Sequence, residues 1–304
     1  MFKYTLDNKR YHTFNYFLRN KFNSKVFKIP IDAHASCPNK LTGGCIYCKD
    51  NSKANITDNS LSLYEQYINE VKILNQKWPN AKHIIYFQTG TNTYMPLEEF
   101  KKNIEPFLGV PEIVGISIAT RSDSLTDDYI EYFKELNKHT FLTVELGLQS
   151  SKNETLKLIN RGHDKENFAK AVKKLKENNI FVVAHIINGL PFENKEDMLE
   201  TINFLNQIKI DGVKIHMLHV LKDTSLEKLY NNTNFHILTK EEYIDIVIDQ
   251  LELLDEKIVI ERITGDPIIE DLITPTWLTK KFILLNDIDK EMVKRNTYQG
   301  KKNN

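Results

Sequence analysis

The sequence has few cysteines, no long hydrophobic run and no excess charge of either sign. Its three cysteines all lie within positions 37–48 of a 304-residue chain. An odd number crowded in this way suits a disulfide framework poorly and suits thiolate ligation of a metal in a reducing compartment. No stretch of about 18 apolar residues is present, and the first residues lack the apolar core of a signal peptide. We therefore expect a cytoplasmic protein that is not bound to a membrane.

The charges balance, with 41 basic and 41 acidic residues. The field of the whole molecule therefore has no general attraction for nucleic acid, and any site for a polyanion must be a local patch. Hydrophobic residues make up 41% of the chain, which is enough for one large α/β core. We expect an N-terminal extension over 1–25, a central domain over 26–256 and a C-terminal extension over 257–304.

Short β-rich runs alternate with helical patterns along the chain. The runs are nearly continuous in apolar residues, as buried parallel strands are. This alternation predicts an α/β fold, which we interpret as a partial (β/α)6 barrel of the TIM type with a short C-terminal extension. An open Rossmann-like sheet is the alternative. The six predicted strands are 26–32, 83–87, 113–119, 141–146, 180–187 and 213–218.

The three cysteines follow the first predicted strand, within the stretch ASCPNKLTGGCIYC at 35–48. Two residues separate Cys45 from Cys48, so a tight turn can present both thiols to one metal centre. With Cys37 they make a three-thiolate site, which would leave one iron of an iron cluster open. The alternatives are a zinc site completed by His34 or another histidine, or three reduced thiols. The spacing alone does not decide between them.

Polar residues stand where the predicted strands end. In a barrel the carboxyl ends of the strands meet on one rim, where barrel enzymes carry their chemistry. A single polar residue at a strand end often only caps a helix or satisfies a loop, so the set is more informative than any member. Its members are Gln88, Thr89, Arg121, Asp123, Gln149, His185, Asn188, His216 and His219.

Several motifs resemble those of a known family. Tyr47 directly before the last cysteine resembles the radical S-adenosylmethionine (SAM) loop, and further similar motifs are YFQTGTNT at 86–93, GISIATRSD at 115–123, VELGLQS at 144–150, INRGHD at 159–164, HIINGLP at 185–191 and KIHMLH at 214–219. Over nearly its whole length the chain resembles the YhcC/YtqA-like radical SAM family, which is related to the radical SAM domain of the Elongator catalytic subunit. The resemblance implies a 4Fe-4S cluster on Cys37, Cys45 and Cys48, and SAM as the second cofactor.

The resemblance also implies which residues bind SAM. Gln149 and Arg161 are spaced like a SAM-binding pair, and a guanidinium can pair directly with the SAM carboxylate. The glycine-glycine-glutamate signature for the SAM amino group is replaced here by Gln88-Thr89-Gly90. Glu145 lies inside an apolar strand, so it needs a partner, either the SAM ribose or a cation of the protein. The full predicted set is Tyr47, Gln88, Thr89, Arg121, Glu145, Gln149, Arg161 and His185.

His216 and His219 resemble family positions that face the substrate. A histidine there could move a proton near neutral pH, and two hydrogen-bonded core or rim histidines are the alternative. Because one cluster uses every cysteine, reactions that need a second cluster or a cysteine methyl carrier are not expected.

The resemblance implies hydrogen abstraction from a tRNA wobble uridine, with tRNA and an external low-potential electron donor as partners. The alternatives are a small-molecule or protein substrate, or a non-catalytic iron-sulfur or zinc protein that binds RNA. Basic residues near both chain ends could form the patch that tRNA needs, and they are Lys3, Lys9, Arg10, Arg19, Lys21, Lys25, Lys28, Lys280, Lys281, Lys290, Lys294 and Arg295.

Overall fold

The computed structural model describes residues 2–49, 58 and 60–303. Seven parallel strands form one sheet in the order β1-β2-β3-β4-β5-β6-β8. A Rossmann-like sheet would reverse its strand order at a switch point, and this sheet does not. The predicted partial barrel is therefore confirmed, with a seventh strand after the six predicted ones. The strands are β1 Val26–Ile31, β2 Lys82–Phe87, β3 Ile113–Thr120, β4 Phe141–Gln149, β5 Phe181–Asn188, β6 Gly212–Met217 and β8 Val259–Arg262.

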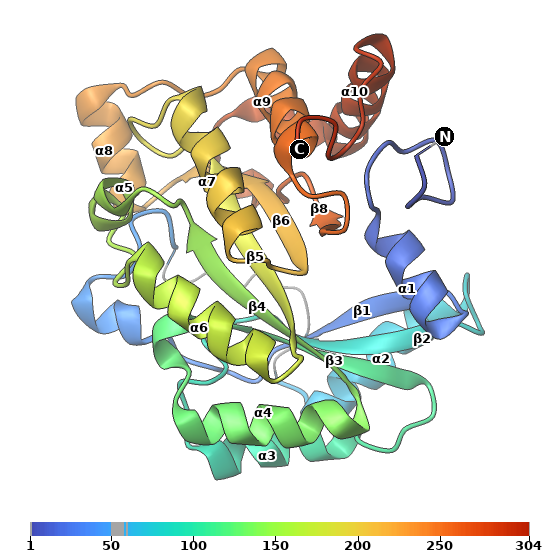
Figure 1. Cartoon of the computed structure of the whole chain (residues 1–304). Helices are drawn as coiled ribbons and strands as arrows, with labels where there is room; N and C mark the ends of the chain where they lie inside the picture. The colour runs from blue at the N-terminus through green and yellow to red at the C-terminus, as the bar shows by residue number, and fades with distance from the viewer. Residues whose placement is uncertain (1, 50–57, 59, 304) are drawn as a thin grey trace.

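Helices alternate with the strands, and Figure 1 shows α4 and α6 packed on the outer face of the sheet. The short helices α5 and α8 lie at the end to which the β4 arrow points. A small antiparallel pair, β7 Val220–Leu221 with β9 Leu272–Thr274, lies beyond β6. The helices are α1 Phe14–Phe22, α2 Leu63–Asn75, α3 Leu97–Ile104, α4 Asp127–His139, α5 Asn153–Leu158, α6 Lys165–Glu177, α7 Lys195–Gln207, α8 Ser225–Thr233, α9 Lys240–Leu253 and α10 Lys281–Lys294. The 3-10 turns are η1 Pro38–Thr42, η2 Glu105–Phe107, η3 Ser122–Ser124, η4 Ile269–Asp271 and η5 Thr276–Lys280.

The main core lies between the sheet and its helices. Val144, Val182 and Val213 on adjacent strands are fully buried there, together with Phe133 of α4 and Phe168 of α6. Burying one such side chain stabilises the fold by about 1.5–3 kcal/mol. The continuous apolar runs in the sequence are thus explained by a sheet with one face under helices and the other face inside the barrel.

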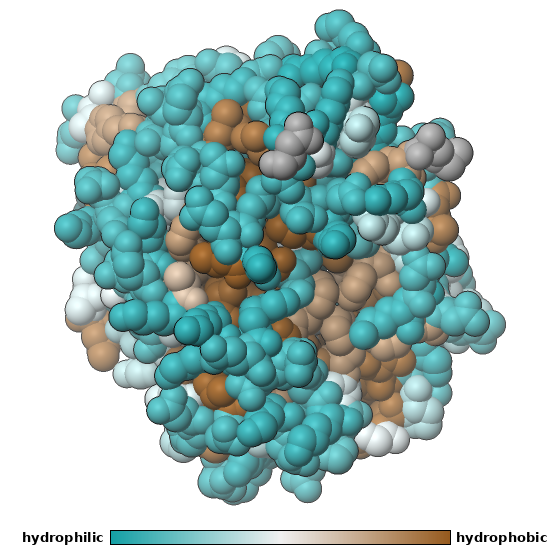
Figure 2. Space-filling model, viewed as in Figure 1, coloured by the Kyte–Doolittle hydropathy of each residue, from teal (hydrophilic) through white to brown (hydrophobic). Residues whose placement is uncertain are grey.

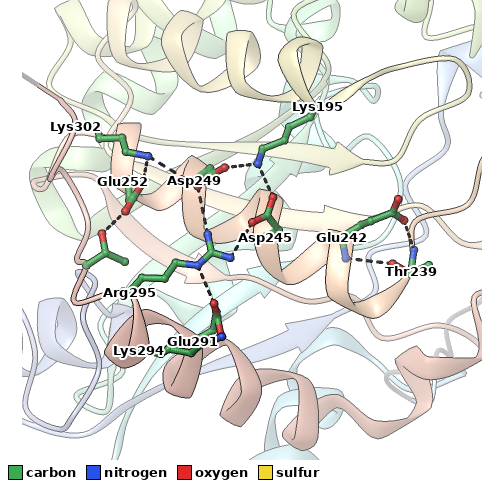
Figure 3. A network of polar contacts seen from close by, with 11 residues as sticks. Lys195, Thr239, Glu242, Asp245, Asp249, Glu252, Glu291, Lys294, Arg295 and Lys302 are labelled. Atoms are coloured by element: carbon green, nitrogen blue, oxygen red, sulfur yellow. Dashed lines mark hydrogen bonds and ion pairs between the residues drawn. The ribbon is translucent and has the colours of Figure 1, made fainter.

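The C-terminal segment packs on the barrel through ion pairs. Figure 3 shows Arg295, directly after α10, bound to Asp245 and Asp249 of α9, and Lys195 of α7 bound to the same two carboxylates. At the N-terminus, the backbone N–H of His12 donates to Gln299 Oε1 at 2.8 Å. Both chain ends therefore lie together beside β8, and the boundaries predicted at 25 and 256 stay predictions.

Hydrophobic surface gathers between α1 and the helices α4 and α6 in Figure 2. A hollow of about 780 Å³ lies there, at the amino ends of the strands, and its lining includes Lys21, Phe141 and Phe181. Apart from Lys21 of the predicted basic patch, its lining contains no predicted site residue, and it lies at the opposite end of the strands from the cysteines. Among the described residues no helix is both long enough and apolar enough to cross a membrane.

Candidate active site

The cysteine loop follows β1 and is fastened to the segment after α5. The side-chain amide of Asn39 donates to Cys45 Sγ at 3.3 Å and to the carbonyl of Asn160 at 2.6 Å. In return, Nδ2 of Asn160 donates to the carbonyls of Thr42 and Gly44 at 2.9 and 2.7 Å. These bonds hold the loop, the blue turn below α5 in Figure 1, against the end of the barrel.

The thiols differ in burial and in charge. Cys45 is buried, Cys37 is partly buried and Cys48 is exposed. A hydrogen bond from the Cys48 thiol lowers the pKa of Cys45 to about 5, against the opposing effect of burial and with help from the charge of Arg161. The same bond raises the pKa of Cys48 well above its ordinary value. Cys45 is thus a thiolate at neutral pH, which is the form that binds iron.

A zinc site and an iron-sulfur cluster differ in how their ligands are placed. Among the described residues no three His, Cys, Asp or Glu side chains converge on one metal position. A zinc site needs its ligands around a single point, whereas a cubane cluster distributes its thiolates over separate irons. His34, the proposed zinc ligand, is exposed.

Arg161 lies between Cys45 and the end of β4. Its Nε and Nη2 donate to the carbonyl of Gly147 at 3.2 and 2.6 Å, and Nη1 lies 3.9 Å from Cys45 Sγ. A Cβ on Gly147 would lie 2.7 Å from Arg161 Nη2 and 2.6 Å from Gln149 Nε2, too close for either side chain to stay. A glycine at this position therefore allows the predicted pair Gln149 and Arg161 to lie together beside a thiol.

Arg121 supplies a buried donor that lacks an acceptor. Its Nε and Nη2 bind Asp123 at 2.8 and 2.7 Å, and Nη1 is buried with no hydrogen-bond partner among the described residues. Burial opposes ionisation of Asp123, and the contact with Arg121 overcomes it, so the pKa of Asp123 is lowered. This unpaired guanidinium N–H lies close enough to Cys37 and Cys45 to feel their charge, and it is placed to donate to an acceptor oxygen of a ligand.

The turn Gln88-Thr89-Gly90 packs on the start of the cysteine loop. The N–H of Thr91 donates to the carbonyl of Ser36 at 2.9 Å. Gly90 has φ +74°, and a Cβ on it would lie 1.9 Å from the carbonyl oxygen of Ala35. Only glycine fits at this approach, which places Thr89 next to the loop that carries Cys37.

Glu145 of β4 has protein donors on both carboxylate oxygens. Oε1 accepts from Lys28 at 2.5 Å and from Ser117 at 2.7 Å, and Oε2 accepts from Tyr86 at 2.9 Å, from His185 at 2.6 Å and from Lys214. Burial raises the pKa of Glu145, but the two lysines outweigh burial and hold it well below its ordinary value. The SAM ribose and a cation of the protein were the alternative partners predicted for Glu145. In the structure Glu145 binds cations of the protein.

His216 and His219 lie at and just beyond the end of β6. Nε2 of each ring is buried without a hydrogen-bond partner among the described residues. Burial, together with the charges of His185 and Arg262, lowers the pKa of His216 well below its ordinary value. Burial also lowers the pKa of His219 to about 4. Both rings are therefore neutral at pH 7.

Four residues of this region were not predicted to belong to the site. Asn39 and Asn160 hold the loop. The only feature of the sequence that pointed to them was their position between or beside predicted site residues. Lys28 and Lys214 were detectable, because each is a charged residue inside an apolar strand, which is the pattern that identified Glu145. Lys28 was instead assigned to a surface patch, and this was wrong: its side chain is 13% exposed and bound to Glu145.

Comparison with known proteins identifies the family of the chain. Residues 36–205 match the Radical SAM superfamily, and residues 210–294 match the Radical_SAM C-terminal domain. The chain therefore belongs to the radical SAM superfamily of enzymes. Within it, the chain is 41% identical to YtqA of Bacillus subtilis over 305 residues, covering 99% of this chain and 95% of YtqA. The predicted membership of the YhcC/YtqA-like family is thus confirmed.

The chain is also similar, more distantly, to enzymes that modify tRNA. Over 156 residues the chain is 30% identical to the tRNA uridine(34) acetyltransferase of Methanocaldococcus infernus, covering 50% of this chain and 29% of that protein. The solved structure of Methanocaldococcus infernus Elp3 with an N-terminal deletion superposes with a TM-score of 0.70 at 21% identity, covering 91% of this chain and 64% of that chain. The second similarity shows a shared fold.

The family uses a 4Fe-4S cluster and SAM, and the residues present fit both. The cysteine loop offers three sulfur donors, and Nη1 of Arg121 is a buried donor without an acceptor beside them. Together the two cofactors supply the deoxyadenosyl radical that abstracts hydrogen from the substrate. The protein must hold the substrate C–H close to that radical and exclude water.

Proposed function

We propose that this radical SAM enzyme modifies the side chain of the wobble uridine of tRNA. The observation that carries the proposal is the similarity of half of the chain to an archaeal tRNA uridine(34) acetyltransferase. The target base would leave its stack and enter the barrel mouth, as bases do in other enzymes that modify them. An external low-potential electron donor would supply the electron.

The cofactor residues divide into two groups in this proposal. Cys37, Cys45 and Cys48 hold the cluster. Arg121 and Arg161 bind the SAM carboxylate, because both guanidinium groups lie beside the thiols and Arg121 has a free N–H. The other proposed SAM contacts are Tyr47, Gln88, Thr89, Gln149 and His185, the last through the ring nitrogen that does not bind Glu145.

Several of the basic residues near the chain ends are neutralised by carboxylates. Lys9 binds Asp289, and Arg295 binds Asp245. Lys3 and Lys281 are paired in the same way, with Glu256 and Asp266. These pairs leave little free charge for phosphate groups.

A local excess of positive charge exists at α1. After the larger effect of burial, the charge of Arg19 lowers the pKa of Lys25, so the two cations lie near each other. Lys21 lies on the same helix, with its Nζ 4.5 Å from the ring centre of Phe141. Because this end of the strands is opposite the cysteines, we propose Arg19, Lys21 and Lys25 as contacts for tRNA phosphates remote from the target base, whose binding should weaken as salt rises.

The deciding experiment is mass spectrometry of tRNA nucleosides from cells with and without the gene. Wild-type protein and Cys48→Ala are each used for rescue. Loss of one modified uridine with accumulation of its precursor, restored only by wild type, supports the proposal. An identical nucleoside profile in all strains contradicts it and leaves a small molecule or a protein as the substrate.

A further inference from the structure

A layer of charged side chains lies inside the barrel. Lys28 from β1 and Lys214 from β6 both bind Glu145, and both also approach Glu261 of β8, at 2.6 and 3.6 Å. All four side chains are at most 13% exposed. Two lysines and two glutamates balance in charge, while Oε1 of Glu261 is buried without a hydrogen-bond partner among the described residues.

Such a layer is a poor way to stabilise a core. Removing ions from water costs several kcal/mol per ion, and well-packed apolar residues of the same volume often give an equal or more stable protein. Stability alone therefore does not account for two lysines and two glutamates in the barrel. Because they are arranged around the carboxylate of Glu145, we look for a role of this residue other than stability.

The role of Glu145 concerns His185. Two lysines, Tyr86 and Ser117 hold Glu145 in its ionised form, which has no proton to donate. The 2.6 Å contact between Glu145 Oε2 and His185 Nε2 must therefore use a proton on the histidine. In the neutral ring this leaves Nδ1 bare, so Glu145 selects one tautomer of His185 and fixes the orientation of its ring.

His185 in turn lies against His216. The two ring centres are 5.4 Å apart, with the ring planes inclined by 37°. Nε2 of His216 is the buried nitrogen without a partner described above, and a buried polar atom of this kind marks a ligand position. The chain of contacts thus runs from the charged layer through His185 to a free nitrogen near the carboxyl end of β6.

We propose that Glu145 is a positioning residue, which orients His185 and through it His216, so that Nε2 of His216 hydrogen-bonds the polar edge of the substrate base. The inference rests on the proposed function, because it takes the substrate to be a uracil ring with imide N–H and carbonyl groups on that edge. A neutral imidazole suits such an uncharged edge. Glu145 itself touches neither cofactor nor substrate in this proposal.

The test observes the histidine rings directly. The full chain carrying its cluster is prepared with ¹⁵N-labelled histidine, and two-bond ¹H–¹⁵N NMR spectra distinguish protonated from bare ring nitrogens. The chain has nine histidines, and a His185→Asn variant identifies the signals of His185. In wild type we expect His185 with a proton on Nε2, a bare Nδ1 and a strongly deshielded Nε2 proton. In Glu145→Gln we expect loss of that signature and a shift of the His216 signals.

Glu261→Gln is the matched control. It removes the same charge from the same layer but does not contact His185, so the His185 signature should persist. A wild-type spectrum in Glu145→Gln, or equal changes in the two variants, would overturn the proposal. If Glu145→Gln does not fold, Glu145→Asp replaces it, because it keeps the charge and withdraws the carboxylate from His185 by one methylene.

A second readout separates this inference from the proposed function. With tRNA from cells that lack the gene, the 5′-deoxyadenosine formed by Glu145→Gln is measured as the reference, because His185 is also a proposed SAM contact and its reorientation would lower SAM cleavage as well. Modified uridine per deoxyadenosine should fall about tenfold, the size expected when one hydrogen bond that orients the base is lost. An unchanged ratio contradicts the positioning role. If wild type modifies no tRNA, the proposed function fails, while the NMR comparison still decides whether Glu145 positions His185.

Discussion

Asn39 and Asn160 bind each other's chain segments reciprocally. Asn39 Nδ2 donates to the carbonyl of Asn160 at 2.6 Å, and Asn160 Nδ2 donates to the carbonyl of Gly44 at 2.7 Å. Asn160 has φ +50°, a left-handed conformation that asparagine and glycine tolerate better than other residues. The cysteine loop is thereby attached to a residue 121 positions later in the chain.

Asn160→Gly should weaken cluster retention without unfolding the protein. Glycine accepts the positive φ, so the variant loses only the side-chain bonds, each of which contributes about 1 kcal/mol. Iron content after anaerobic desalting should fall below that of wild type. Asn23→Gly is the control, because Asn23 has φ +49° at the end of α1, away from the loop. Equal iron loss in the two variants would show that the Asn160 bonds do not hold the loop.

The cysteines are tested by metal content. Anaerobically reconstituted protein should contain about four iron atoms per chain, as one cubane cluster requires. Replacing Cys37, Cys45 or Cys48 by Ala should abolish the cluster absorption, because each thiolate holds a separate iron. Stoichiometric zinc without an iron-sulfur signal in the wild type would contradict the cluster assignment.

Arg161→Ala should weaken SAM binding and leave the iron content near normal. The substitution removes a proposed carboxylate partner but no thiolate. Arg161→Lys should not restore affinity, because an ammonium cannot reproduce the two bonds to Gly147 and still reach Cys45. Calorimetric titration with SAM measures the effect, and an affinity equal to wild type would exclude Arg161 from the SAM site.

His219 should make the protein less stable in mild acid. Its pKa is about 4 in the folded protein because the ring is buried, whereas the unfolded value is 6.5. The unfolded chain therefore binds the proton more readily, and unfolding becomes easier as pH falls below 6.5. Between pH 7 and 5 the loss from this group is about 2 kcal/mol at most. Urea titrations at both pH values should show a smaller difference for His219→Gln, and an undiminished difference would contradict this origin.

The fold class was predictable because buried parallel strands leave continuous apolar runs, and the alternation of strands and helices in this chain was clear. The cysteine loop was predictable because three thiols in twelve positions are rare by chance. It was harder to predict on which face of its strand a residue lies. Lys28 and Lys214 interrupt apolar runs at positions that face the barrel interior, yet a lysine is usually a surface residue. Counting which strand residues share the inward face with Glu145 would have found both.

The titration of the histidines and the pairing of the terminal lysines could not be predicted. The lowered pKa of His219 arises from burial, which depends on how the segment after β6 packs. Lys9 is neutralised by Asp289, 280 positions away, and only the folded chain brings the two together. A basic cluster in a sequence therefore indicates a surface patch only after its carboxylate partners are known.

The charge balance inside the barrel crosses the boundary between the two matched regions. Glu145 lies within 36–205, whereas Lys214 and Glu261 lie within 210–294. A nascent chain that has not yet reached β8 holds both lysines with a single glutamate, and thus an uncompensated cation in a dry interior. The layer becomes neutral only when β8 adds Glu261, so the last strand of the sheet completes the ion pairs of the barrel interior. A gene split between the two regions would leave one lysine and one glutamate in each half, Lys28 with Glu145 and Lys214 with Glu261, but it would break the two ion pairs that join the halves, Lys214 with Glu145 and Lys28 with Glu261.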